Sequence, residues 1–267
     1  MSGICYLVGT PIGNLGDITY RAVETLQLVD IIASEDTRKT RILLDRYGIK
    51  KPLISYHQHK EREGSEEIAM LLESGKSVAL VSDAGMPGIS DPGAVLVREL
   101  RKRGLAVTVV PGASAVTSAV SLAGLEENGF AFVGFLPEKN KDRVSLLETL
   151  KLLTIPLVFY CAPHDLEKNI AFLYEQLGER ELYAVKEITK IYETVYTGKL
   201  SGIDIANKKG EFVLVVGGAK EGEQVDIKAL LRECLEQGMS RSQAVKSVAQ
   251  ATKLPKNEVY SCSLELE

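Results

Sequence analysis

Short apolar runs alternate with amphipathic stretches along the first half of the chain. Strand candidates lie at 4–8, 30–33, 52–55, 78–82 and 106–110, and helix candidates lie between them at 20–29, 38–47, 62–74 and 92–103. This alternation is typical of a doubly wound parallel α/β sheet. A further helical stretch at 114–122 closes the block, so the pattern predicts an N-terminal α/β domain over 1–122. The polar, Gly-containing segment 123–129 is the expected interdomain connection.

A second α/β block is predicted over 130–219. Its strand candidates are 130–135, 155–160, 182–187, 192–197 and 211–216, and its helix candidates are 141–153 and 164–177. The short gap between 182–187 and 192–197 favours antiparallel pairing, so we expect a mixed sheet. The segment 217–222 reads GGAKEG, which is typical of a linker.

A small helical module is predicted over 226–267. Gly238 ends its first helix, and Ser240 with Gln243 forms a capping-box pattern at the start of the second. Pro255 suits the first position of a third helix. Helix, short turn and helix in this order are typical of a helix-turn-helix module. The stretch 240–256 holds four basic residues and no acidic one, which fits either nucleic-acid contact or a helical cap with solvated charges.

Composition narrows the class of protein. The chain has 267 residues, of which 45% are hydrophobic and 25% charged, and a formal net charge of -4. A generic nucleic-acid coat would be basic, so any nucleic-acid contact must come from local patches. No secretory signal pattern opens the chain, and no apolar run approaches the ~20 residues of a membrane span. Four scattered cysteines without a CxxC pair indicate a reduced cytoplasmic protein without a structural metal.

Loops of small residues follow three of the predicted strands. They read GTPIGN at 9–14, which includes Pro11, SDAGMPGISDPG at 82–93, and PGASA at 111–115. Gly and Pro in such loops set unusual backbone angles and let a ligand approach the main chain. Ligands of open α/β sheets bind at the carboxyl ends of the strands, so these loops predict a ligand site. Neither GxGxxG nor GxxxxGK[ST] is present, so the two nucleotide-binding fingerprints do not apply.

Eight segments also occur in a specific order, namely LVGTPIGNLGDIT, ASEDTR, SYHQHKE, LVSDAGMPGISDPG, VPGASA, FVGFLP, YCAPH and KEITKIYE. Over 4–216 this order resembles the ribosomal RNA small subunit methyltransferase I family of the tetrapyrrole methylase superfamily. The C-terminal helices resemble the terminal helix-turn-helix domain of that family. The resemblance implies methyl transfer from S-adenosylmethionine to the ribose 2'-oxygen of a cytidine in the decoding region of 16S rRNA. It also implies a homodimer, with the cofactor between the two α/β domains.

The resemblance implies a set of cofactor-binding residues. In the first domain these are Leu7, Asp83, Met86, Ser114 and Ala115, together with Pro11 in the first loop. In the second domain we expect contributions near Tyr160, Cys161, Lys190 and Glu211. Asp83 would accept hydrogen bonds from the cofactor, and backbone amides near Gly85 and Ser114 would bind its carboxylate.

Methyl transfer needs an aligned sulfonium and hydroxyl rather than a metal or a covalent intermediate. The hydroxyl is a weak acid, so a positioned base or acceptor would help. The candidates for this base or acceptor are Glu35, Asp36, His57, His59, Glu187 and Lys190. From these we predict Glu35, Asp36 and Lys190 as catalytic residues, together with Arg38. Arg38, Lys39 and Arg41 form a basic cluster that would neutralise RNA phosphates or simply face solvent.

The chain departs from the family pattern at 160–165. The usual segment reads YEAPHR, whereas this chain has Cys161 and Asp165 in place of Glu and Arg. The negative and the positive charge of the usual segment are both absent, as expected if the two side chains paired with each other. The details of the second-domain site are therefore not fixed by the resemblance. Two alternatives remain, a methyltransferase for a small tetrapyrrole-type molecule and a non-catalytic RNA or ribosome-assembly binder. The basic clusters and the terminal helices argue against the first, and the intact first-domain loops argue against the second.

Overall fold

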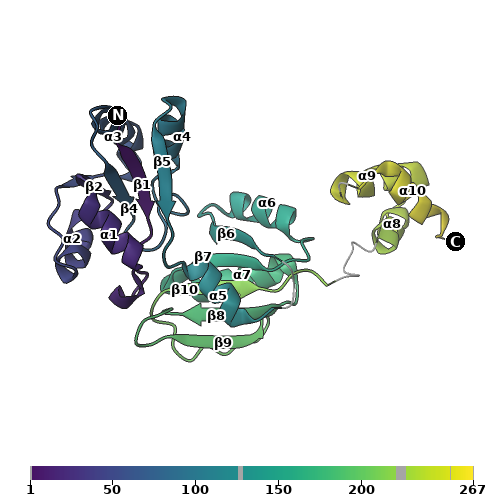
Figure 1. Ribbon diagram of the computed structural model, residues 1–267. Helices are drawn as coiled ribbons and strands as arrows, with labels where there is room; N and C mark the ends of the chain where they lie inside the picture. The colour runs from purple at the N-terminus through teal and green to yellow at the C-terminus, as the bar shows by residue number, and fades with distance from the viewer. Residues whose placement is uncertain (1, 126–128, 221–226, 253, 267) are drawn as a thin grey trace.

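A computed structural model describes residues 2–125, 129–220, 227–252 and 254–266. Figure 1 shows two layered α/β parts followed by three helices that stand apart from them. The expected connections 123–129 and 217–222 lie partly outside the described residues, as do Asp226 and Lys253. The two sheets confirm the predicted fold class, because one is parallel and the other mixed.

The first sheet is fully parallel in its described strands. It is built from β1 (Ile4–Val8), β2 (Ile31–Ser34), β3 (Leu53–Ser55), β4 (Val78–Val81) and β5 (Ala106–Val110) in the order β3-β2-β4-β1-β5. The central strand β4 is apolar at every position because both its faces are covered. Val78 and Leu80 belong to the core on one side, and Ala79 and Val81 belong to the core on the other.

Helices cover the two faces of this sheet in pairs. On one face lie α1 (Tyr20–Leu28) and α2 (Thr37–Arg46), and on the other lie α3 (Glu61–Glu73) and α4 (Ala94–Lys102). Short 3-10 turns precede α1 and α3, at Leu15–Asp17 and Gln58–Lys60. The chain leaves β1 toward β2 and leaves β4 toward β5, in opposite directions along the sheet. The switch point, where open α/β sheets bind their ligands, therefore lies between β1 and β4.

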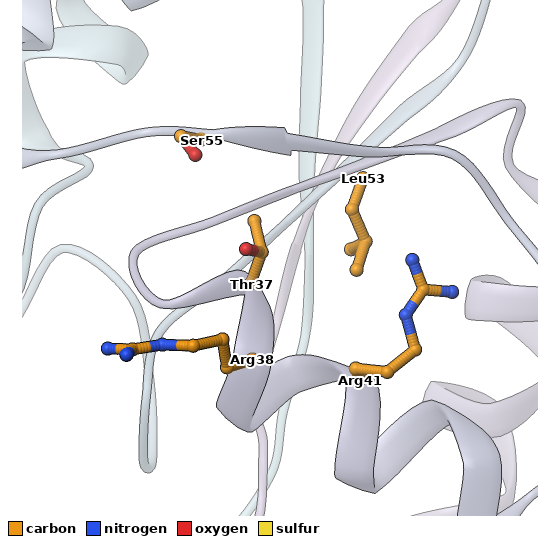
Figure 2. A pocket seen from close by; sticks show the side chains of 5 residues that line it. All are labelled: Thr37, Arg38, Arg41, Leu53 and Ser55. Atoms are coloured by element: carbon orange, nitrogen blue, oxygen red, sulfur yellow. The ribbon is translucent and has the colours of Figure 1, made fainter.

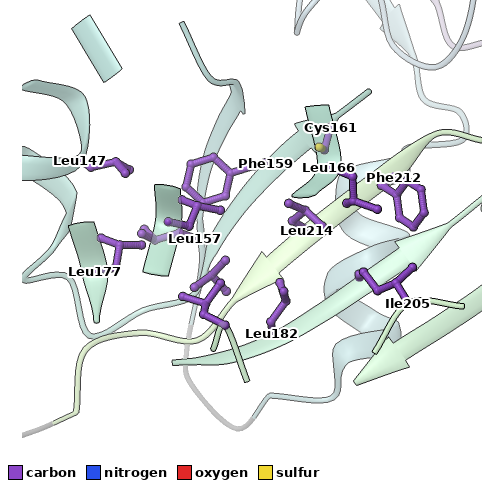
Figure 3. Close-up of a cluster of buried hydrophobic side chains, with 14 residues drawn as sticks. Leu147, Leu157, Phe159, Cys161, Leu166, Leu177, Leu182, Ile205, Phe212 and Leu214 are labelled. Carbon is purple, nitrogen blue, oxygen red and sulfur yellow. The ribbon is translucent and has the colours of Figure 1, made fainter. Parts of the chain in front are cut away.

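The second sheet is mixed, as its sequence predicts. It contains β6 (Ala131–Phe135), β7 (Leu157–Cys161), β8 (Glu181–Lys186), β9 (Thr194–Lys199) and β10 (Phe212–Val216), in the order β6-β7-β10-β8-β9. Only β6 and β7 pair in parallel among these strands. The helices α6 (Asn140–Leu150) and α7 (Leu166–Leu177), the latter preceded by a 3-10 turn at Pro163–Asp165, cover one face. Figure 3 shows the core beneath them, which includes Phe159, Leu166 and Leu214.

Helix α5 (Ala115–Ala123) packs on the second sheet, not on the first. Its Val116 and Ala119 share a core with Val185, Val213 and Val215 from β8 and β10. The predicted range 1–122 includes this helix, and its packing favours an earlier end for the first domain. The sequence pattern placed α5 with the first sheet because it follows β5 directly in the chain. In the structure, the chain crosses to the second sheet after β5. We propose that the first domain ends near Val110, while the ranges 130–219 and 226–267 stay predictions.

The three C-terminal helices form a core of their own. They are α8 (Ile227–Glu236), α9 (Arg241–Thr252) and α10 (Lys256–Leu264), and Leu231, Val248 and Val259 are buried among them. The capping box exists, because Ser240 Oγ accepts from the Gln243 amide at 3.4 Å and Gln243 Oε1 accepts from the Ser240 amide at 2.9 Å. Pro255 is the N-cap of α10, one position earlier than expected. Within the described ranges, no helix has the length and apolarity that a membrane span requires.

Candidate active site

The loops after β1 and β4 are joined at the switch point. Thr10 donates its amide to the Gly85 carbonyl at 2.9 Å, and Gly85 donates its amide to the Thr10 carbonyl at 3.1 Å. The Thr10 hydroxyl also donates to the Ser82 carbonyl at 3.2 Å. Gly85 has a φ of 74°, a conformation that glycine adopts without strain. This bridge uses the amide of Gly85 itself. The expectation that backbone amides near Gly85 bind a ligand carboxylate therefore stays a prediction for the neighbouring amides of the loop.

The loop after β5 closes against the same bridge. A Cβ on Gly9 would lie 2.7 Å from Gly112 Cα and 2.6 Å from Met86 Sδ. The small residues therefore let three loops pack backbone against backbone. Predicted residues Pro11, Gly85, Met86 and Ser114 are brought together here. The three packed loops form one continuous surface, the floor of the candidate site, at the carboxyl ends of β1, β4 and β5.

The start of α5 offers hydrogen-bond donors beside this floor. Ser114 is the N-cap residue, yet its side chain makes no capping hydrogen bond. The first amides of a helix have no partner within the helix, and an anion commonly binds them. In the described part of the chain no acceptor is recorded for the amide of Ala115. The anion-binding role of Ser114 and Ala115 stays a prediction, which the uncapped start of α5 favours.

Asp83 connects the β4 loop to the start of α2. Its Oδ1 accepts from the Asp36 amide at 3.1 Å, and its Oδ2 binds Lys39 Nζ at 2.7 Å. This contact with Asp83 raises the pKa of Lys39. Asp36 caps α2 and binds the Arg38 guanidinium through both carboxylate oxygens, at 3.1 and 2.9 Å. Its hydrogen bonds with Arg38 lower the pKa of Asp36 to about 2.

Asp91 is a candidate residue that sequence reasoning missed. Burial, followed by the charges of Glu35 and Asp83, raises the pKa of Asp91 to about 6. The charges of Glu35 and Asp83 thus act on Asp91 near the switch point. The signal was present in the sequence, because Asp91 is the second aspartate of the Gly- and Pro-rich loop that supplies Asp83. Among the described residues, no group of three or more side chains is arranged to hold a metal ion.

The second sheet faces this loop through Tyr160. The Tyr160 ring packs against Phe132 and Phe135, with centroid distances of 5.0 and 5.4 Å. Burial, and then the charge of Asp91, raises the pKa of Tyr160. A bulge in β6 places Gly134 with a φ of 81° near Ser90, whose Oγ would lie 4.0 Å from a Cβ there. The β4 loop therefore meets the ends of β6 and β7, and we refer to this junction of the two α/β parts, where the sequence predicts the cofactor, as the crevice.

Lys190 and Glu211 come together at the other side of the crevice. Lys190 Nζ binds Glu187 Oε1 at 2.9 Å and Glu211 Oε2 at 2.8 Å. The Lys190 side chain lies against the first loop, since a Cβ on Gly13 would be 2.5 Å from its Cγ. Glu187 and Thr189 have φ values of 50° and 65°, which are unusual for residues other than glycine. Such strain tends to persist at functional sites, so this loop joins the candidate site.

Family comparisons agree with this geometry. The model of the Tetrapyrrole (Corrin/Porphyrin) Methylases matches residues 5–204, and that of the RsmI C-terminal HTH domain matches residues 221–267. A Synechocystis protein named ribosomal RNA small subunit methyltransferase I is 44% identical, over 99% of both chains. The chain belongs to this family of tetrapyrrole methylases. A Bacillus subtilis relative of the same name is 42% identical over 97% of this chain and 93% of its own length.

One family member is shorter than this chain. A Thermotoga maritima relative of the same name is 46% identical and matches 81% of this chain over 99% of its own length. Solved structures share the fold at lower identity. A uroporphyrin-III-C-methyltransferase from Thermus thermophilus is 22% identical with a TM-score of 0.58, and covers 80% of this chain and 94% of its own. A diphthine synthase is 15% identical with a TM-score of 0.62, and covers 88% and 95%.

Cys161, where this chain departs from the family pattern, does not line the crevice with its side chain. Cys161 and Tyr160 are neighbours on β7, so their side chains lie on opposite faces of the sheet. Figure 3 shows Cys161 in the core that α7 covers. There its Sγ accepts from Asn169 Nδ2 at 3.4 Å, and Asn169 Oδ1 accepts from the buried Arg143 at 2.8 Å. Burial raises the pKa of Cys161.

Three further predicted residues lie away from the crevice's polar groups. Leu7 packs against the core beneath α3 and α4. The side chains of His57 and His59 are exposed beyond β3 and make no hydrogen bond or ion pair with the described residues. The candidate site therefore consists of the interlocked loops, the carboxylates around Asp83, Tyr160 and the Lys190 loop.

Proposed function

We propose that this chain transfers the methyl group of S-adenosylmethionine to the ribose 2'-oxygen of a cytidine in the decoding region of 16S rRNA. The small ribosomal subunit is the substrate, and the active form is a homodimer in the cytoplasm. The observation that carries the proposal is the 44% identity over 99% of both chains with a relative of that name. The crevice at the switch point supports it, since this is where open α/β sheets bind ligands.

The residues present fit S-adenosylmethionine, which bears a carboxylate and two positive charges. The uncapped start of α5 at Ser114 and Ala115 would hold the carboxylate. Asp83 and Asp91 would face the positive charges, and Met86 with the interlocked loops would exclude water. When bound, the cofactor supplies a methyl group that is activated by its sulfonium.

The remaining polar residues of the candidate site, which could act on the 2'-hydroxyl, are several carboxylates and the charged Lys190. Burial lowers the pKa of Lys190, but hydrogen bonds to Glu211 and Glu187 outweigh it and raise the pKa overall. Lys190 is therefore protonated at neutral pH and would stabilise negative charge rather than take a proton. Asp36 holds Arg38 and caps α2, which positions the loop. Glu35 and Asp91 are left to orient the 2'-hydroxyl.

Labelled-methyl transfer tests the proposal. The chain is incubated with labelled S-adenosylmethionine and small ribosomal subunits that lack the modification, and the labelled nucleoside is identified after digestion. We expect label in 2'-O-methylcytidine. Cofactor binding without transfer to RNA would overturn the proposal, and transfer to a tetrapyrrole instead would assign the small-molecule alternative. A chain that does not bind the cofactor in calorimetry would be a non-catalytic binder.

A further inference from the structure

The basic cluster at the start of α2 is not uniform. Arg38 is held by the Asp36 carboxylate, and Lys39 is held by Asp83. Arg41 lies one turn further along the same helix and is exposed. Within the described ranges, the Arg41 side chain has no ion pair or hydrogen-bonded partner. The sequence predicts RNA contact for the cluster as a whole, whereas the structure pairs Arg38 and Lys39 with carboxylates and leaves the charge of Arg41 available.

Arg41 also lines a hollow in the protein surface. The cavity has a volume of about 430 Å³ and is lined by Thr37, Arg38, Arg41, Leu53 and Ser55. In Figure 2 the Arg41 side chain reaches toward Leu53, while Arg38 extends in the opposite direction. Thr37 and Ser55 contribute hydroxyl groups on the side nearer the strand. None of the lining residues is acidic, so the hollow combines a guanidinium with two hydroxyl donors.

This combination matches the chemistry of a phosphodiester. A guanidinium donates two hydrogen bonds in a planar fork that fits phosphate oxygens, and hydroxyl groups supply further donors. Contacts of this kind set the register of a nucleic acid without reading its bases. The aliphatic Leu53 provides an apolar wall against which a ribose can pack. A hollow of this size lies within the ~300–1,000 Å³ range of small-molecule sites.

The hollow adjoins the crevice through the start of α2. Thr37 is the first residue of α2, and the preceding Asp36 donates its amide to Asp83 of the β4 loop. Ser55 ends β3, the edge strand of the first sheet, so the hollow lies at the same carboxyl edge as the crevice. An RNA strand with one nucleotide in the crevice can therefore place a neighbouring phosphate in the hollow.

We propose that Arg41, with the hydroxyls of Thr37 and Ser55, binds a backbone phosphate of the RNA next to the nucleotide that is methylated. This assignment rests on the proposed function. It makes Arg41 a substrate-binding residue with no role in cofactor binding. Lys39 and Arg38 have a different role in this assignment, because their ion pairs with carboxylates hold the loop in place.

The test compares Arg41→Ala with Arg46→Ala, a control that removes an exposed arginine from the last turn of the same helix. Methyl transfer to small ribosomal subunits is measured over a salt series. We expect Arg41→Ala to raise KM about tenfold with kcat nearly unchanged, and to lower the slope of log KM against log salt by about 0.7 for one single-strand phosphate contact. Arg46→Ala should match the wild type. Arg41→Lys should recover part of the loss, because it keeps the charge without the fork.

Direct binding separates this proposal from the proposed function. A single-stranded RNA oligonucleotide with the sequence of the decoding region, and the same sequence with an uncharged methylphosphonate backbone, serve as probes in fluorescence anisotropy. We expect Arg41→Ala to bind the charged probe less tightly than the wild type does. The variant and the wild type should bind the uncharged probe with equal affinity. Equal binding of the charged probe by both proteins would overturn the phosphate site, as would a difference that persists with the uncharged probe. A wild type that binds RNA through Arg41 but transfers no methyl group would overturn only the proposed function.

Discussion

Asp91 should make the stability of this protein depend on pH in an unusual direction. Burial and the neighbouring Glu35 and Asp83 raise its pKa from 3.8 to about 6. Between about pH 4 and pH 6 the folded chain therefore holds a proton that the unfolded chain has released. Stability falls with rising pH wherever the folded state binds more protons. The contribution of Asp91 is thus most favourable below pH 4 and is lost as the pH rises through 6.

The size of the effect follows from the shift. About two pKa units correspond to ~3 kcal/mol if the whole shift is expressed as stability. Asp91 is only half-buried and solvent screens its neighbours, so we expect roughly 1 kcal/mol. Asp91→Asn removes the titration without removing the side chain's volume. Relative to the wild type, this variant should gain about 1 kcal/mol of unfolding free energy between pH 4 and pH 7.

Urea unfolding at a series of pH values measures this difference. Subtracting the wild-type curve cancels the other titrating groups, and Asp204→Asn, at an exposed position, provides the matched control. The control should show no pH-dependent difference. A gap between Asp91→Asn and the wild type that stays constant across the range would refute the reasoning, because Asp91 would then ionise in the folded chain as it does in the unfolded one.

Three other predictions concern packing and the C-terminal module. Gly9→Ala should cost about 2 kcal/mol of stability in urea unfolding and weaken cofactor binding in calorimetry, because its Cβ would overlap the Gly112 backbone at 2.7 Å. Asn169→Ala should cost about 2–3 kcal/mol in the same unfolding assay, because Arg143, only 5% exposed, loses its 2.8 Å acceptor. A chain that ends at Lys220 should keep its thermal transition and cofactor affinity, since the last three helices have their own core, while methyl transfer to subunits falls about tenfold through lost basic contacts. Equal transfer by both lengths of chain would show that the module only caps the fold.

Most of the fold could be predicted because periodicity reports burial directly. The run VALV at 78–81 is apolar throughout because both faces of β4 are covered, and this reads from the sequence without any structure. The placement of α5 could not be read in this way. Its apolar stripe specifies that it packs on a sheet but not on which sheet, and chain order pointed to the wrong one.

The candidate site shows a similar division. Asp83, Lys190 and Glu211 were predicted from the resemblance, and the structure places each beside the crevice or at its rim. Cys161 was predicted together with Tyr160, although the side chains of neighbouring residues on a strand point to opposite faces, so only one of the two side chains can line the crevice. Asp91 was missed because its importance comes from burial near two other carboxylates. That proximity depends on the fold of the loop rather than on any spacing within it.

The distribution of charge explains how an acidic chain can act on RNA. Within the crevice, the cations Lys39 and Lys190 are paired with carboxylates, so this region stays negative overall and suits a positively charged cofactor. Outside it, the Arg41 side chain has no acidic partner among the described residues, and the stretch 240–256 holds four basic residues and no acidic one. Phosphate binding depends on local unpaired cations rather than on net charge. A formal charge of -4 is therefore compatible with an RNA substrate, because the acidic groups gather where we propose that the cofactor binds and the free basic groups lie where the RNA would approach.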